Sequence, residues 1–386
     1  EPPLLTSFSE FESVYGGLDG LTFEGEGRSH NDMAHAVRAF FDNGGRRLYV
    51  SRVYEEGRDG RAATGTLGGL ELQARWPGAA GSFTVRFSID LSEDTVVPAV
   101  GGAPTALTGV QQYDTVLVSA AAGSTSPGID AGLYYLDQGR DTVRGIDTWA
   151  LMRADAVDDP PLISVDGTGV EVRVVTVSVS TGPMGRFMGP RTWDGLAPHP
   201  RHPRSMLQVF APAVAARRST ELYVPLVIRA TPEKTGVDIV AELLSASTRE
   251  FGPTSLDSVA YFDSLGGPVE ITCQLDGGSD GARPRPAGYE GRASAGSRRS
   301  GLQALEELED ISVVAAPGST REVLGDGASA DAGAIQQLLI DHAERMRYRI
   351  AILDSPRGAS PDQIRSHRAT MDSRWAALYY PWVRID

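Results

Sequence analysis

The chain ends in Trp375-Ala-Ala-Leu-Tyr-Tyr-Pro-Trp-Val-Arg-Ile-Asp386, an almost unbroken apolar and aromatic run. Such a run is typical of a β-strand that is buried on both faces, as in a parallel or mixed sheet covered by helices. A buried strand normally leads into a turn and a further element. Because this chain stops one residue after Ile385, we expect the domain to continue in residues outside this sequence.

Helix and strand patterns alternate before this run, as an α/β fold requires. Helices are predicted at residues 301–309, 332–347 and 361–374, and strands at residues 311–316 and 349–353. The N-terminal residues have the same texture, with amphipathic helices at residues 8–15 and 31–41 and a strand at residues 47–53. Connections of this length build parallel sheets. We predict one discontinuous α/β domain with a mixed sheet, made of residues 1–56 and 300–386.

Residues 57–299 differ, because glycine-rich turns there separate short runs with β-strand alternation. The predicted strands are residues 70–75, 82–89, 113–119, 132–136, 170–180, 221–230 and 270–275, with one helix at 237–245. This spacing indicates a β sandwich or open barrel. We predict an inserted β-rich outer module, either one unit or two (57–200 and 201–299). Residues 198–203, rich in proline, are expected to form a surface loop, and residues 277–300 a long mobile loop.

Composition limits the kinds of protein that this chain can be. It has 386 residues, 41% of them hydrophobic and 22% charged, so it is globular and long enough for two or three cores. The formal net charge of −14 argues against nucleic acid as a partner, because phosphate binding needs a basic surface. No apolar window long enough to span a bilayer occurs, so direct membrane insertion is not expected. The single cysteine, Cys273, excludes an internal disulfide.

Two patterns resemble sites of chemistry, and each has a simpler structural explanation. Gly277-Gly-Ser-Asp-Gly281 matches the G-x-S-x-G pattern of a nucleophile elbow, but the prolines that follow disfavour the helix that such a turn requires. His199 and His202, with His30 and His35, could supply imidazoles to a metal. The prolines around the first pair favour an extended loop over a rigid metal site.

Asp354 is a third candidate, since acids that follow buried strands often point into α/β active sites. A proline follows closely, so a role in capping the turn is the better explanation. We predict no catalytic, cofactor-binding or metal-binding residue, no cofactor and no enzymatic activity. Two alternatives stay open: an α/β hydrolase or carbohydrate-active enzyme with an unrecognised site, and a β-rich adhesion or binding module.

Five blocks of sequence occur in an order shared with a known protein family. They are Pro3-Leu-Leu-Thr-Ser-Phe-Ser-Glu-Phe-Glu12 with Tyr15-Gly-Gly17; Ala39-Phe-Phe-Asp-Asn-Gly-Gly45 with Leu48-Tyr-Val-Ser-Arg-Val53; Leu72-Gln-Ala-Arg-Trp-Pro-Gly-Ala-Ala-Gly81; Leu302-Gln-Ala-Leu-Glu306 with Ala316-Pro-Gly318; and the run from Ala376 to Ile385. In these blocks the chain resembles the contractile sheath proteins of phage tails, R-type pyocins and extracellular contractile injection systems. The likeness covers both α/β segments well and the middle poorly.

The resemblance implies a structural subunit of a contractile machine. Sheath subunits form stacked six-fold rings in a helical lattice around an inner tube protein, between baseplate and terminal cap proteins. Their N- and C-terminal arms add strands to a neighbour's sheet, and contraction drives the tube through a target envelope. The resemblance also implies assembly in the bacterial cytoplasm as part of a phage tail or tail-like particle. Both linking arms are expected to be absent from this chain, which would leave sticky sheet edges.

A set of structural residues is predicted to shape the sheath core. The set is Phe40, Phe41, Asn43, Gly44, Gly45, Tyr379, Tyr380, Pro381 and Trp382. Asn43, Gly44 and Gly45 are expected to supply the left-handed backbone geometry that ends a helix. The aromatic members from the two ends of the chain are expected to meet in one core.

Overall fold

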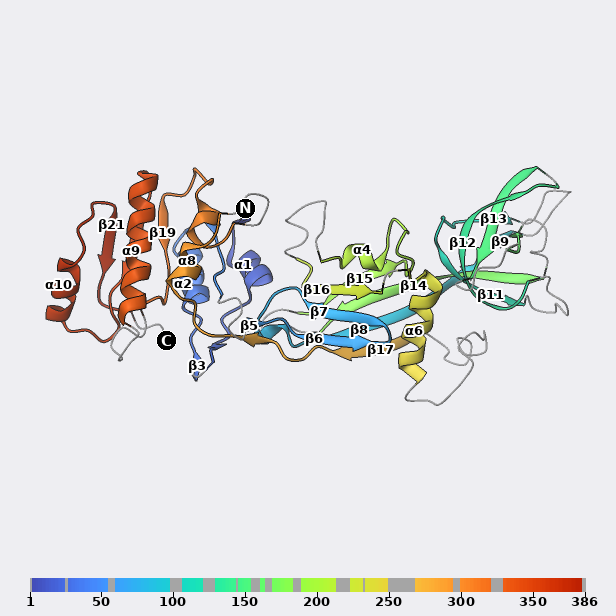
Figure 1. Cartoon of the computed structure of the whole chain (residues 1–386), viewed down its shortest axis with the longest axis horizontal. Helices are drawn as coiled ribbons and strands as arrows, with labels where there is room; N and C mark the ends of the chain where they lie inside the picture. The colour runs from blue at the N-terminus through green and yellow to red at the C-terminus, as the bar shows by residue number, and fades with distance from the viewer. Residues whose placement is uncertain are drawn as a thin grey trace.

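Both termini of the chain lie at the same end of an elongated molecule (Figure 1). The computed structural model describes residues 2–24, 27–54, 60–97, 106–120, 129–143, 145–153, 160–163, 169–182, 189–212, 223–231, 233–248, 268–293, 299–320 and 329–383. The fold combines α-helices with several β-sheets, the largest of which is antiparallel.

A seven-stranded antiparallel sheet forms the middle and the far end of the molecule (Figure 1). Its strands are β8 (Thr84–Asp94), β11 (Thr115–Ala120), β12 (Gly132–Asp141), β13 (Ile146–Met152), β14 (Val170–Thr181), β15 (Arg191–Leu196) and β17 (Val269–Gln274). The order is β13-β12-β11-β14-β8-β17, and β15 pairs with the second half of β14. Strand β14 is central because it pairs with β8, β11 and β15, and nearly every second residue along it is buried.

Strand β14 connects two hydrophobic cores. Val175, Val177 and Val179 belong to the main core, whereas Val170 and Val172 belong to a smaller core at the far end. The main core lies between the seven-stranded sheet, a three-stranded sheet and one helix. These are β6 (Thr64–Leu67), β7 (Leu70–Ala74), β16 (Leu226–Ala230) and α6 (Gly236–Thr248). The β-rich character predicted for the middle of the chain is confirmed.

The N-terminal elements pack around a small core of their own. They are β1 (Leu4–Leu5), α1 (Phe8–Tyr15), α2 (Asp32–Asp42) and β4 (Leu48–Tyr49). Each helix begins at a polar cap, since Ser7 accepts a hydrogen bond from the N–H of Glu10 and Asn31 accepts one from the N–H of Ala34. The apolar sides of both helices then meet around Phe11, while β1 and β4 pair antiparallel.

Three parallel strands and two helices form the C-terminal part. They are β19 (Val313–Ala315), α9 (Ser329–Met346), β20 (Ile350–Asp354), α10 (Pro361–Ala369) and β21 (Ala376–Tyr379), in the sheet order β19-β20-β21. A capping box of Ser360 and Gln363 starts α10, with a proline in its first turn. Leu339 of α9 packs against one face of the sheet in a core with Leu353.

Short elements connect these parts. They are the antiparallel pairs β2 (Leu21–Thr22) with β3 (Arg28–Ser29), β5 (Gly60–Arg61) with β18 (Ser279–Asp280) and β9 (Val96–Val97) with β10 (Ala106–Leu107), the helices α4 (Met206–Val209) and α8 (Pro286–Glu290), and 3₁₀ turns at Ala79–Gly81 and Gly301–Leu305.

The final aromatic run differs from its prediction. Strand β21 covers only four residues at a sheet edge, and its side chains are half-buried or exposed. Tyr379 is 63% exposed. The expectation of burial on both faces was wrong. Aromatic content does not distinguish a central strand from an edge strand, because the neighbours that decide this position come from elsewhere in the chain.

The sheets at this end also differ from the predicted single mixed sheet. The described strands of residues 1–56 and 300–386 form three separate sheets, β1-β4, β2-β3 and β19-β20-β21. Strand β4 has two residues where residues 47–53 were predicted, because β1 is too short to pair with the rest. The predicted helix at residues 301–309 is a 3₁₀ turn. The predicted loop at residues 277–300 contains α8, which starts at Pro286 because the fixed φ of proline suits a first helical turn.

Candidate functional site at an open sheet edge

Strand β21 forms one edge of the C-terminal sheet. It pairs with β20 on one side, and no strand among the described residues pairs with its other side. The carbonyl of Trp375 accepts a backbone bond from Ala351 at 2.8 Å, and that of Tyr379 accepts one from the residue after β20 at 3.2 Å. Since backbone groups alternate in direction along a strand, Ala376 and Leu378 point their N–H and C=O groups away from β20.

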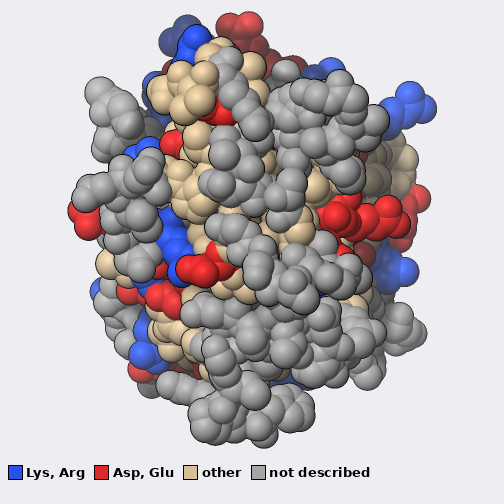
Figure 2. Space-filling model, turned by 90° about the vertical axis from the view of Figure 1, so that its right-hand side faces the viewer, with Lys and Arg blue, Asp and Glu red and all other residues tan. Residues whose placement is uncertain are grey.

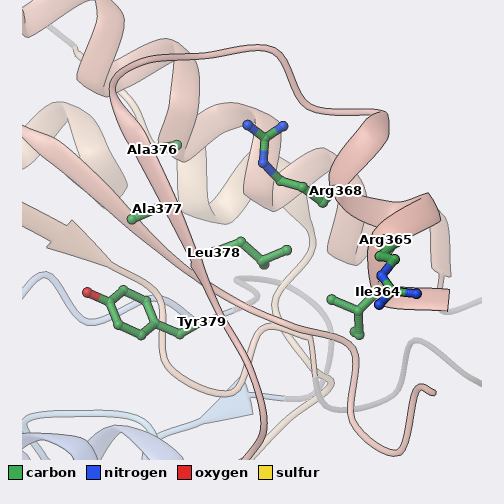
Figure 3. Close-up of a pocket in the computed structure, with 7 residues that line it drawn as sticks. All are labelled: Ile364, Arg365, Arg368, Ala376, Ala377, Leu378 and Tyr379. Carbon is green, nitrogen blue, oxygen red and sulfur yellow. The ribbon is translucent and has the colours of Figure 1, made fainter. Parts of the chain in front are cut away.

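A groove of about 510 Å³ follows this open strand (Figure 3). It is lined by Ile364, Arg365 and Arg368 of α10 and by the four residues of β21. Figure 3 shows the Leu378 side chain pointing toward Ile364 and the Tyr379 ring pointing to the other side of the strand. The groove therefore has an apolar floor next to a row of free backbone groups.

Two arginines of α10 give this groove a cationic rim. Arg365 forms an exposed ion pair with Asp362 at 2.9 Å, and Arg368 donates to the carbonyl of Met371 at 2.5 Å. The sequence pattern does not single out either arginine, although an i,i+3 spacing places both on one side of a helix.

The second face of the C-terminal sheet is open as well. Right-handed crossovers place α9 and α10 on the same face, where His367 of α10 and Gln336 of α9 hydrogen bond at 3.0 Å. On the opposite face, Val313, Ile350 and Tyr379 are 53%, 36% and 63% exposed. Because parallel sheets are normally covered on both faces, this apolar face belongs with the open edge as a candidate interaction surface.

A buried arginine fastens the start of this sheet. Arg349 is 1% exposed and donates to the carbonyls of Leu305 and Leu308 at 2.8 and 2.5 Å. Its Nη1 lies 2.7 Å from Nε2 of His342. Burial, followed by the Arg349 charge, lowers the pKa of His342 to about 4. The imidazole is therefore neutral at pH 7, and the guanidinium holds the turn before β19 against the sheet.

The far end of the molecule has a different surface. Figure 2 shows this end with acidic and basic residues interspersed among uncharged ones. Charges of both signs lie side by side there, whereas two arginines rim the groove beside β21.

The predicted structural residues fall into two different clusters. Phe41 packs in the N-terminal core, and Phe40 is 40% exposed. The C-terminal sheet packs instead around its own core, so the expected meeting of the two aromatic groups in one core is wrong. Trp382 donates its indole N–H to the carbonyl of Ser355 at 2.6 Å, and Tyr380 is 44% exposed. The sequence identifies these aromatic residues but not which surface each one covers.

The helix end at residues 43–45 follows its prediction in part. Only Gly44 has a left-handed backbone, with φ of 89°. Asn43 has φ of −94° and instead donates its side chain to the carbonyl of Ala39 at 2.8 Å. Gly45 is required for space, because a Cβ there would collide with the ring of Phe40.

The proline-rich segment at residues 198–203 is a loop, as predicted, and Arg201 and Pro203 are exposed, but its two histidines are buried. His199 and His202 are 5% and 4% exposed. The His199 ring lies 4.8 Å from the rings of both Tyr113 and Tyr135. Its Nδ1 accepts the N–H of Arg201 at 3.2 Å, so the segment can be buried with its polar groups satisfied. Burial, together with the Arg201 and His202 charges, lowers the pKa of His199 to about 4.

The four histidines do not come together. His30 and His35 form their own ring contact at 5.9 Å, and His202 pairs with Asp114 at 3.3 Å, where burial raises the pKa of the carboxyl. In the part of the chain that the structure describes, no group of three or more histidine, cysteine, aspartate or glutamate residues could hold a metal.

The remaining sequence candidates occupy structural positions. Ser279 lies in β18 and accepts the N–H of Gly281 at 3.1 Å, so it is not on a strand-to-helix turn. Asp354 ends β20, where burial raises the pKa of its carboxyl and a hydrogen bond from the N–H of Gly318 opposes the shift. The carbonyl of Asp354 accepts a bond from Gln336 at 2.8 Å. These contacts fit a carboxylate that joins the ends of two strands.

Among the described residues, no helix is long and apolar enough to cross a membrane. In comparisons with known proteins, no protein-family model matches the chain and no curated protein matches it significantly. The open edge of β21, its groove and the uncovered sheet face are the features that carry the functional argument.

Proposed function

We propose that this chain is a non-enzymatic structural subunit of a contractile sheath, and that neighbouring subunits join it by adding strands to the open edge of β21. The observation that carries the proposal is that edge, whose outer backbone groups are unpaired in the described residues beside an apolar groove. Such edges take up a strand from another chain by backbone hydrogen bonding, and soluble proteins otherwise block them.

The energetics suit a lattice of repeated weak contacts. Ala376 and Leu378 offer two donors and two acceptors, and each backbone hydrogen bond contributes about 0.5–1.5 kcal/mol net. Burying side chains of the added strand over Leu378 and Ile364 contributes further. The binding free energy of one such joint is modest. Many identical joints in stacked six-fold rings would hold the lattice firmly in sum, while each single joint could still rearrange during contraction.

The proposal includes a discontinuous α/β core, formed by residues 1–56 and 300–386 and interrupted by the β-rich residues 57–299. Contacts between the two segments support it. Arg47 forms an ion pair with Asp310, the Tyr49 hydroxyl donates to the same carboxylate at 2.9 Å, and Tyr49 packs on the C-terminal core. The inner tube, baseplate and cap proteins are the further partners that a sheath subunit would have.

The test is electron microscopy of the full-length protein, expressed alone and with an inner tube protein. Hollow, six-fold, helically striated cylinders are the expected result, and a persistent monomer in both preparations contradicts the proposal. Two matched variants locate the joint: Ala376→Pro removes an outward N–H, whereas Ala377→Pro removes one that faces β20. Ala376→Pro should abolish cylinders while the monomer keeps its thermal midpoint, and cylinders that persist in this variant rule out β21 as the joint.

A further inference from the structure

Two parts of the molecule share no hydrophobic core. The terminal unit, within residues 2–54 and 282–383, packs around the N-terminal and C-terminal cores, and the β-rich body, within residues 60–280, packs around the other two. No described residue of one part belongs to a core of the other. Figure 1 shows the two parts in succession along the long axis, with β5 at their junction. Their relative orientation therefore depends on the contacts at this boundary.

The first of these contacts is a neck made of the paired strands β5 and β18. The chain passes from one part to the other twice, before β5 and after β18. In the neck, the Asp280 carboxylate accepts the N–H of Thr22 from the terminal unit at 2.9 Å and the N–H of Ala79 from the body at 3.0 Å. Arg52 of the terminal unit donates to the carbonyl of Pro77 at 2.6 Å. The neck is therefore a hydrogen-bonded connection between the two parts.

Part of the sequence block at residues 72–81 serves this neck. Gly78 has φ of 139°, a backbone conformation that side chains rarely adopt. A Cβ at this position would lie 3.2 Å from a carboxylate oxygen of Asp280 and 3.4 Å from the guanidinium of Arg52. Glycine thus provides both the backbone conformation and the space that the close approach of the two parts requires.

The second contact involves other elements and is made by one side chain. Arg191 of β15 donates through Nη1 to the carbonyl of Tyr223 in the body, and through Nη2 to the carbonyl of Ser13 in α1 at 2.8 Å. Ser13 lies in the last turn of α1, where carbonyls lack partners within the helix and α1 has no basic residue of its own. Because a cation is favoured at this end of a helix, Arg191 supplies from the body the charge that α1 lacks.

A cavity separates the two parts beside this arginine. It is lined by Ser13 and Tyr15 of α1, by Ala74 and Pro225 of the body, and by Arg191 itself. Parts of a chain that meet through small polar contacts normally move relative to each other, whereas a large apolar interface would hold them still. Arg191 is therefore placed to oppose a swing of the body about the neck.

We propose that the β-rich body swings against the terminal unit about the neck, and that Arg191 is a strap that holds the closed arrangement by binding carbonyls of both parts. When the strap is released, the neck still joins the two parts, and each keeps its own cores. Release would therefore open the boundary without unfolding either part, as in other hinge movements. The proposal does not depend on the sheath function.

The test measures a distance across the boundary by pulsed electron spin resonance. Spin labels at Ser9→Cys on α1 and Glu71→Cys on β7 report on the two parts, and both positions are exposed. Cys273 is buried, and burial raises the pKa of its thiol, so it should stay unlabelled. In this parent chain we expect one narrow distance distribution. Arg191→Met should add longer distances and widen the distribution at least twofold.

Three further measurements separate a swing from other effects. Arg191→Lys keeps the charge but not the fork that binds two carbonyls, so it should give an intermediate width. Arg229→Met removes a guanidinium whose contact with Gln73, at 2.8 Å, stays inside the body, and it should leave the distribution unchanged. Labels at Ser9→Cys and Arg38→Cys both lie in the terminal unit, and their distance should not respond to Arg191→Met. Thermal unfolding establishes that each variant is folded.

Three results would overturn the proposal. The first is a distribution in Arg191→Met equal to that of the parent chain, whether the parent distribution is narrow or broad. The second is equal widening by Arg229→Met. The third is widening between the labels at residues 9 and 38, which would mean that α1 frays at its own end while the body stays in place.

Discussion

Two sheets of the molecule differ in how far they are covered. One is the seven-stranded sheet in the middle of the molecule, and the other is the three-stranded sheet at its C-terminal end. In the middle, Phe87 and Val177 are fully buried, and a second sheet and a helix cover the core. At the C-terminal end, helices cover one face, while β21, β19 and the face that carries Val313 stay open in the described residues. The middle is therefore the better-packed region, and under the proposed function the thin parallel sheet would supply the surfaces for partners.

The largest expected effect separates these two roles. Phe87→Ala removes a ring that is 0% exposed in β8 and should cost about 3–5 kcal/mol of unfolding free energy. Tyr379→Ala removes a ring that is 63% exposed and should change it by less than about 0.5 kcal/mol. Urea unfolding of both variants at 25 °C measures the two values. Equal losses of unfolding free energy in the two variants would contradict the proposed difference between the two sheets.

The sequence predicts the local elements of the middle sheet well, because its signal is local. The alternation along residues 170–180 predicts a strand, and the structure shows burial of every second residue on either side of an irregularity between Arg173 and Val175. The long helices α6 and α9 also lie close to their predicted bounds. Periodicity within one segment is sufficient for such elements.

Neighbour-dependent features could not be predicted in the same way. The run at residues 376–379 indicates a strand, but only the tertiary arrangement decides that it lies at an edge with Ala376 and Leu378 facing outward. Burial of His199 depends likewise on Tyr113 and Tyr135, which are distant in sequence. The candidate site therefore lies in a strand that the sequence predicts, but this strand is partly exposed where the sequence indicated burial.

A second prediction concerns how the C-terminal sheet is fastened. Arg349→Met leaves the carbonyls of Leu305 and Leu308 without their charged donor and should cost about 2–3 kcal/mol. Arg349→Lys keeps a charge but cannot span both carbonyls, so it should recover only part of the loss. Urea unfolding gives the cost, and hydrogen exchange should show loosening at residues 301–308 while β8 keeps its protection. Equal loosening of β8 would contradict the separation of the two regions.

The same variant has a spectroscopic readout at His342. Burial is the main cause of its low pKa, and the Arg349 charge is the second. Removing that charge should raise the pKa of His342 from about 4 toward its ordinary value without reaching it. A titration followed by NMR measures this shift, and an unchanged pKa would mean that the two side chains are not in contact in solution.

A third prediction tests the middle region by pH. The pKa of His199 is lowered to about 4 in the folded chain, mainly by burial, against 6.5 when it is unfolded. Between these pH values the unfolded state therefore binds more protons than the folded state. The stability that comes from burying neutral His199 is complete above pH 6.5 and is lost as pH falls toward 4. At pH 5 the loss should be roughly 2 kcal/mol. His199→Gln should flatten this part of the stability curve, and an equally steep loss in the variant would assign it to other groups.

The smallest effect distinguishes the two faces of the C-terminal sheet, using neighbouring valines of β19. Val314 is 4% exposed under α9, so Val314→Thr buries a hydroxyl and should cost about 1–3 kcal/mol. Val313 is 53% exposed on the opposite face, so Val313→Thr should change stability by less than about 0.5 kcal/mol. If partners cover that face, Val313→Thr should instead weaken self-association in sedimentation velocity experiments. A cost for Val313→Thr as large as that for Val314→Thr would mean that the face is already covered within the monomer, and the surface would have to be sought elsewhere.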